Sequence, residues 1–333
     1  MARARLKMVL LAAATAMALG ASARAETLTD ALISAYTHSN LLEQNRALLR
    51  ATDENVAQAV ATLRPVINFV ASAGFAMPRP ASDNYTAAIA LTADITLYDF
   101  GRTRLGIDAA KETVLATREA LIGIEQNVLL TAVGAYMEVI RAAQFVSIAD
   151  NNVRVITQEL RAARDRFEVG EVTRTDVSIA EARLAAARSN LAAAQGDFNV
   201  AREAYKAAIG RYPGQLRDPK APPMTADTLD AAKAIAVRGH PAIRQLQRQV
   251  TVAELNIARA KAAMRPTITG SLETTLNQDR NTSNSVGLRL TQPIYRGGAL
   301  SSLLRQAIAN ADATRSELRQ TVLTIRQDVG TAW

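Results

Sequence analysis

Apolar residues recur at steps of three and four over two long stretches of the chain, 101–167 and 174–209. Such steps place the apolar residues on one face of an α-helix. The first stretch contains no proline between Gly101 and Phe167. At 1.5 Å per residue, about 65 residues form a helix roughly 100 Å long, far longer than an ordinary globular helix. The pattern therefore predicts a long helical hairpin, as in coiled coils and extended tubes.

A short turn joins the two expected helices. Gly170 suits the left-handed backbone position that commonly ends a helix. Thr173, with Asp176 three residues later, resembles the capping box that starts the next helix. Taken alone, this hairpin would equally suit a coiled-coil spacer. Its tip consists of Val169, Gly170, Glu171, Val172 and Thr173.

Alternating apolar and polar residues replace the helical pattern in four other stretches, 65–77, 84–98, 266–278 and 284–295. Each pair predicts a hairpin with one apolar and one polar face, as in membrane-barrel strands. A half-buried hairpin of a soluble protein shows the same alternation, so the pattern leaves both interpretations open. In a membrane, we expect the apolar positions to face lipid, and these include Ile67, Phe69, Leu91 and Leu288. The polar positions would line an aqueous lumen, and these include Thr269, Ser271, Glu273 and Arg289.

Four strands cannot close a membrane barrel, because such barrels start at eight strands. An open sheet edge cannot face lipid, since its backbone groups would lack hydrogen-bond partners. If these strands cross a membrane, the protein must therefore oligomerise. Two chains would supply eight strands and three chains twelve.

The chain carries an internal repeat. Thr27-Leu28 returns as Thr228-Leu229, and Arg64-Pro65 returns as Arg265-Pro266, both at an offset of 201 residues. The first copy spans 26–226 and comprises a helix at 27–64, strands at 65–77 and 84–98, helices at 101–167 and 174–209, and a Pro-rich connector at 210–226. The second copy spans 227–333 and comprises a helix at 227–264, strands at 266–278 and 284–295, and a helix at 299–333. We expect this second copy to be incomplete, since its last helical pattern reaches Trp333 without a stop signal.

The first 25 residues have the three parts of an export signal: a basic start, an apolar run at 8–19, and Ala23-Arg24-Ala25 as a cleavage motif. Removing residues 1–25 would lower the formal net charge from +8 to +4. No basic run or aromatic–basic platform remains, so we expect no nucleic-acid partner. The chain has no Cys and two isolated His residues. It shows no catalytic or nucleotide-binding motif, so we expect no catalytic site, metal site or cofactor.

With these features, the sequence resembles the TolC-type outer-membrane efflux family. The resemblance covers 26–333 and rests on the repeat together with several stretches, of which the tip is the most specific. The matching stretches are Glu26–Leu32, Arg64-Pro65, Leu97–Gly101 and Arg166–Val177. One departure is Asn40-Leu41, where members often have Asn-Pro, and this puts the turn there in doubt.

The resemblance implies a mainly α-helical fold with transmembrane β-hairpins, in which a homotrimer shares a 12-stranded outer-membrane barrel above a periplasmic helical tunnel. It also implies a passive exit duct for type I protein secretion, multidrug efflux or both. The duct would dock onto a periplasmic adaptor protein and an inner-membrane transporter of the ABC or RND class. By analogy, residues Val169–Thr173 would form one adaptor-docking tip. The alternative is a soluble periplasmic coiled-coil adaptor or scaffold, because adaptors also carry long helical hairpins.

Overall fold

The computed structural model describes residues 25–76, 84–221 and 223–333. Ala25 is described and exposed. The rest of the expected export signal, including Ala23, lies outside the described residues. The chain divides into two units, one formed by residues up to Leu42 with 125–223, the other by 43–124 with 224–333.

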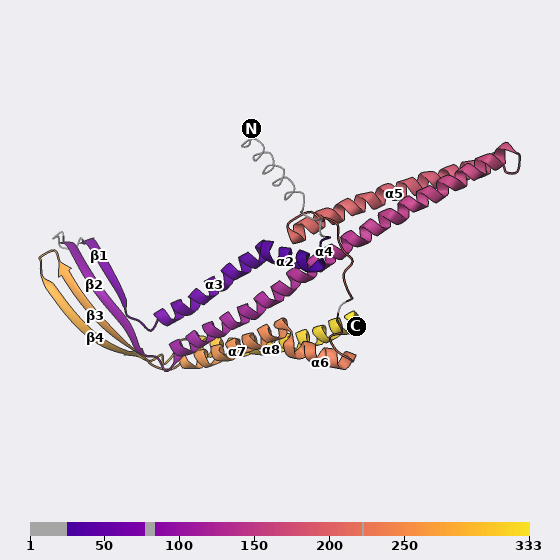
Figure 1. Ribbon diagram of the computed structural model, residues 1–333. Coiled ribbons are helices and arrows are strands. Elements are labelled where there is room, and N and C mark those ends of the chain that lie inside the picture. The colour runs from indigo at the N-terminus through magenta and orange to yellow at the C-terminus, as the bar shows by residue number, and fades with distance from the viewer. Residues whose placement is uncertain (1–24, 77–83, 222) are drawn as a thin grey trace, which may run out of the picture. The chain divides into compact units, whose positions relative to one another are not determined.

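The second unit contains the strands. They are β1 (Val66–Ala76), β2 (Asn84–Tyr98), β3 (Thr267–Asn277) and β4 (Thr282–Thr291). They form one antiparallel sheet in the order β1-β2-β3-β4 (Figure 1). Strand β4 ends four residues earlier than expected. Pro293 lacks the N–H that a ladder needs, and the Gln292 side chain bonds instead to the Met264 carbonyl at 3.1 Å.

The helices follow the same order in both copies of the repeat. The first copy has α2 (Leu28–His38), α3 (Asn40–Ala61), α4 (Arg102–Glu168) and α5 (Arg174–Ile209). The second copy has α6 (Leu229–Gly239), α7 (Pro241–Ala262) and α8 (Ala299–Ala332). Helix α4 is continuous over 67 residues, and α5 runs back along it (Figure 1).

The first helix of each copy was expected to be continuous, at 27–64 and 227–264, and both expectations are wrong. Ser39 leaves helical geometry, with φ −73° and ψ 104°, and its hydroxyl accepts from the Leu42 N–H at 3.3 Å. His240 leaves it with φ −67° and ψ 127°, because the residue before a proline avoids the α region. Pro241 then opens α7. The break in the first copy therefore forms at the equivalent position without proline.

The core of the first unit lies where α2, α4 and α5 meet. Its centre is Tyr136 of α4 and Tyr205 of α5, both fully buried. Small residues surround the rings and allow the helices to approach closely, and these are Ala31, Ala35, Ala132, Ala142 and Ala201.

Glu26 ties the start of this unit to its end. Its backbone pairs with the connector, since the Glu26 N–H donates to the Gln215 carbonyl at 2.8 Å and its carbonyl accepts from the Arg217 N–H at 3.0 Å. Its carboxylate accepts from the Tyr205 hydroxyl at 2.7 Å and from the Arg211 guanidinium at 2.8 Å. The Tyr136 hydroxyl donates to the Arg217 carbonyl at 2.6 Å. Three of these hydrogen bonds join the two ends of the first copy to each other, and the bonds from Tyr205 and Tyr136 join those ends to α5 and α4.

Burial keeps the two tyrosines neutral. Desolvation raises the pKa of Tyr136 above its ordinary value of 10.0, and it raises the pKa of Tyr205 further. Because the pKa of each tyrosine is raised in the folded state, the neutral hydroxyls contribute stability that is complete below pH 10. This stability is lost as the pH rises through the folded-state pKa.

We predict that Tyr136→Phe lowers the free energy of unfolding by about 0.5–1.5 kcal/mol, because the part-buried hydrogen bond from its hydroxyl to the Arg217 carbonyl is lost. Tyr212→Phe is the matched control. Its hydroxyl bonds to Glu203 at the surface, so we expect a change below about 0.5 kcal/mol. Urea unfolding followed by helical circular dichroism measures both. Equal midpoints for the two variants would contradict the role given to Tyr136.

Candidate functional site

The strand register assigns every residue of the sheet to one of two faces. Residues directly opposite each other on neighbouring strands point to the same side. Phe69 lies opposite Leu91, Leu91 opposite Thr274, and Gly270 opposite Leu288. Following these pairs across the sheet places Ile67, Phe69, Leu91 and Leu288 on one face.

This apolar face is open to the surroundings. Its side chains are 66% exposed at Ile67, 69% at Phe69 and 74% at Leu288. Among the described residues, no helix of the second unit covers the sheet. A face of large aliphatic and aromatic side chains left uncovered in one chain marks an interaction surface, with membrane or with protein.

The opposite face carries the polar residues expected to line a lumen. Thr269 lies opposite Arg289 and Glu273 lies opposite Ser285, while Ser271 lies opposite Asp94. All four expected lumen residues therefore share one face. The backbone is also fitted closely there, because a Cβ atom added to Gly287 would lie 2.8 Å from the Ser271 hydroxyl oxygen.

The tip of the α4–α5 hairpin is a tight turn built from two capping motifs. Gly170 has φ +79°, the left-handed geometry that glycine adopts without strain. Its N–H donates to the Phe167 carbonyl at 3.0 Å, and the Glu171 N–H donates to the Arg166 carbonyl at 2.9 Å. These two bonds form a Schellman motif. They satisfy the last carbonyls of α4 and fix the direction of the turn.

Thr173 then starts α5 with a complete capping box. Its backbone N–H donates to the Asp176 carboxylate at 2.8 Å, and the Asp176 N–H lies 3.4 Å from its hydroxyl oxygen. The Thr173 hydroxyl also donates to the Asp176 carboxylate at 2.7 Å. This bond, together with the one from the Thr173 N–H, holds the pKa of Asp176 below its ordinary value. The ionised cap therefore stabilises the fold at pH values above the ordinary pKa of Asp176. This stabilisation is lost as the pH falls through the folded-state pKa.

The fixed turn presents its side chains outward. Val169 is 72% exposed, Glu171 is exposed, and Val172 is half-buried. Just behind the tip, Arg164 of α4 pairs with Glu181 of α5 at 2.6 Å. The tip is thus a rigid loop with an exposed apolar residue, which suits it to contact another protein.

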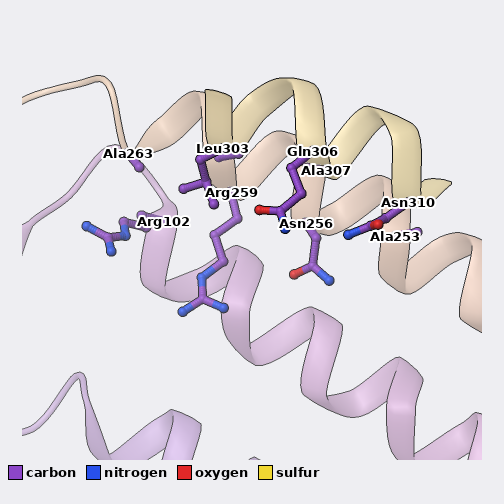
Figure 2. A pocket seen from close by; sticks show the side chains of 10 residues that line it. Arg102, Ala253, Asn256, Arg259, Ala263, Leu303, Gln306, Ala307 and Asn310 are labelled. Carbon is purple, nitrogen blue, oxygen red and sulfur yellow. The ribbon is translucent and has the colours of Figure 1, made fainter. Parts of the chain in front are cut away.

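A cavity of about 370 Å³ lies among the start of α4, α7 and α8 (Figure 2). Two arginines and three amides supply its polar lining, namely Arg102, Arg259, Asn256, Gln306 and Asn310. The Arg259 guanidinium reaches α4, where a Cβ on Gly106 would lie 3.7 Å from it. Across the described residues, no cluster of three or more His, Cys, Asp or Glu could hold a metal ion.

Comparison with known proteins identifies the family of the chain. The model of the outer membrane efflux protein family matches residues 32–211 and 235–333. The outer membrane efflux protein BepC of Brucella suis is 35% identical over 324 residues, which cover 94% of this chain and 70% of BepC. The chain belongs to the outer membrane efflux protein family. Escherichia coli TolC is 24% identical, over 91% of this chain and 67% of TolC.

Solved structures of efflux channels have the same fold. The CmeC outer-membrane channel of Campylobacter jejuni superposes with a TM-score of 0.77 at 16% identity, over 89% of this chain and 68% of CmeC. The expected fold of helical tunnel and membrane β-barrel is therefore confirmed. Efflux-family membership also confirms the outer membrane as the location and favours the channel over the alternative of a soluble adaptor.

Three residues of the first unit's core network cannot be connected from the sequence. Glu26, Tyr136 and Tyr205 are far apart in the chain, and no pattern connects them. A more visible signal is the Leu97–Gly101 stretch, which contributes to the family resemblance. There the backbone of Phe100 takes φ +56°, which a sequence pattern does not show.

We predict that Gly170→Ala loosens the tip without unfolding the chain. A side chain at φ +79° costs about 1 kcal/mol or more whatever space is available. Gly196→Ala is the matched control, since Gly196 lies within α5 with no atom near its Cβ position, and alanine favours a helix. Hydrogen exchange should speed up at 166–176 in the first variant and stay unchanged or slow down around 196 in the second. Unchanged exchange at the tip in Gly170→Ala would contradict the strain argument.

Proposed function

We propose that the chain is a subunit of a trimeric exit duct in the outer membrane, for secreted proteins or for small toxic compounds. The observation that carries this proposal is the four-stranded sheet with one apolar and one polar face and with two free edges. The edges are β1 and β4. In a membrane each edge must pair with another chain, because lipid offers no hydrogen bonds to the backbone. Three copies supply twelve strands and close the barrel.

Exposed apolar residues on the long helices support the same assembly. Leu130 and Ile148 of α4 are 69% and 64% exposed, and Val200 of α5 is 69% exposed. An 18-residue window of α4 has a mean hydropathy of 1.3 and is only 11% buried. By length and composition this window could cross a membrane, but a single such window is a weak indication of a span. Neighbouring helices of a tunnel wall would cover it equally well.

The lipid-facing and lumen-facing sets follow from this assembly. Ile67, Phe69, Leu91 and Leu288 would face hydrocarbon, and Thr269, Ser271, Glu273 and Arg289 would line the water-filled interior. The register supports the division, because it separates the two sets onto opposite faces. The mechanism is then passive. The duct supplies a polar path across the membrane, and energy enters through a transporter in the inner membrane.

Leu91→Lys tests the membrane face. Leu91 is the central residue of β2, and we predict that lysine there costs about 2–4 kcal/mol of insertion free energy. Ala90→Lys is the matched control, since Ala90 lies opposite Val70 and Thr275 on the polar face. Heat-resistant oligomers in outer-membrane fractions should be lost in Leu91→Lys and kept in Ala90→Lys. Equal loss in both variants would refute the assignment of the faces.

We further propose that the tip, Val169–Thr173, docks onto a periplasmic adaptor that links the duct to an ABC or RND transporter. Its rigid double cap and its exposed Val169 support this role, because a preformed loop loses little entropy on binding.

Val169→Asp should abolish export while oligomers remain in the outer membrane, because a charge replaces the apolar contact. Thr175→Asp adds the same charge in the first turn of α5, where the helix dipole tolerates it, and should export normally. Export of a reporter substrate and oligomer content are measured together. Normal export by Val169→Asp would remove the tip from the docking site.

A further inference from the structure

We infer that the end of the sheet nearest the helices holds a binding site for the phosphate of an anionic phospholipid headgroup. The site consists of Tyr98, Phe100 and Arg265, with further arginines around it. This inference rests on the proposed membrane placement of the strands.

A β-bulge brings Tyr98 onto the apolar face. Thr96 lies opposite Thr269 on the polar face, and without an irregularity Tyr98 would share that face. The register shifts between these two residues, so that Tyr98 lies opposite Ile268 instead. Ile268 itself lies opposite Leu290 of the apolar face. Bulges commonly re-aim a side chain in this way. Tyr98, which is 53% exposed, is therefore the last residue of β2 on the lipid-facing side.

Phe100 and Arg265 complete the cluster. The Tyr98 and Phe100 rings meet edge to face with centroids 4.7 Å apart. The Arg265 guanidinium lies over the Phe100 ring, 5.6 Å from its centroid. No carboxylate among the described residues forms an ion pair with Arg265, and its side chain is exposed. The ring holds the guanidinium in place while its hydrogen-bond donors remain available to an anion.

The backbone of Phe100 is strained, and the strain is not needed for the turn. Phe100 and Gly101 have φ values of +56° and +81°. The second copy makes the same turn with Gly297 and Gly298, at +57° and +82°. Glycine therefore suffices at this position, yet the first copy carries a phenylalanine. Strain retained at an ordinary residue suggests that the side chain has a function.

The surroundings of this cluster are strongly basic. The segments 62–66, 97–106, 257–267 and 292–305 carry eight exposed basic residues, namely Arg64, Arg102, Arg104, Arg259, Lys261, Arg265, Arg296 and Arg305. Asp99 is the one carboxylate in these segments. Its oxygens already accept from Gly101 at 3.1 Å and from Thr103 at 2.7 Å. The turn at the other end of the sheet is balanced, with Asp279 beside Arg280.

A membrane surface is the ligand that matches these features together. The cluster continues an apolar face, so a lipid chain would lie against the strands while the headgroup reaches the arginines. Aromatic residues favour the same interfacial depth. Basic residues next to a membrane attract anionic lipids, and each contributes enough to change the affinity about fivefold. A free phosphate ion would use the arginines but would gain nothing from Tyr98 or from the apolar face.

The test is a titration of the purified full chain, in detergent micelles, with phosphatidylglycerol, phosphatidylcholine or inorganic phosphate. Native mass spectrometry counts the bound molecules. We expect phosphatidylglycerol to bind best and inorganic phosphate not to compete at equal concentration. Arg265→Gln should weaken phosphatidylglycerol binding about fivefold, and Arg265→Lys should retain most of it.

Phe100→Gly separates this site from a purely structural role. Glycine relieves the strained backbone, so the fold is kept, but the ring beneath Arg265 is lost and the lipid preference should fall. Arg280→Gly is the matched control, because Arg280 also has φ +56° and lies at the other end of the sheet. It should bind phosphatidylglycerol as the native chain does.

Three outcomes would overturn the inference: equal binding of the two lipids, full competition by inorganic phosphate, or native binding by both Arg265→Gln and Phe100→Gly. If the lipids bind equally, or both variants bind natively, in a chain that still forms outer-membrane oligomers, only the lipid site is refuted. The proposed channel is then unaffected. Failure of the Leu91→Lys test would instead remove the membrane placement itself.

Discussion

The hydrogen-bond requirement of the sheet edges constrains the rest of this structure. In water, the free N–H and C=O groups of β1 and β4 would be solvated at little cost, but in hydrocarbon each unpaired group costs several kcal/mol. One chain supplies four strands, too few to close a membrane barrel. A family member in the outer membrane must therefore share its barrel with other copies. The proposed shared barrel also accounts for the apolar surface that is exposed in a single chain.

The two copies of the repeat form the same helix break and the same strand-to-helix turn with different residues. Both copies break their first helix at the equivalent position, the first with Ser39 as a side-chain cap and the second with His240 before Pro241. Both copies also turn from strand to helix through two left-handed residues, Phe100-Gly101 and Gly297-Gly298. The backbone geometry is thus retained where the sequence differs. This is why the helix break at Asn40 survives without the proline that the resemblance favours.

The periodic features of the fold were predictable from sequence, and the local exceptions were not. Alternation along the strands placed Leu91 and Thr269 on opposite faces, as the register has them, because side chains alternate strictly along a strand. The bulge at Leu97 adds one residue without changing the apolar pattern, so nothing in the sequence moves Tyr98 to the other face. The long helices were predictable within one residue because their apolar stripes are uninterrupted. The helical pattern runs through the breaks at Ser39 and His240, because alanine-rich stripes continue on both sides of them, and only the family resemblance indicated a turn at Asn40.

The contacts that unite distant segments lie beyond any local pattern. Glu26 meets Tyr205 and Arg211 across about 180 residues of chain, and only the folded helices bring them together. The same holds where sheet and helices meet. Both oxygens of Asp99 cap the start of α4, and its single negative charge faces eight basic residues in the surrounding segments. The positive charge left at this end is therefore a consequence of how the strand-to-helix turn is built. In the second copy α8 starts without a side-chain cap. Arg296 stands there in the place of Asp99 and makes this end of the sheet more basic still.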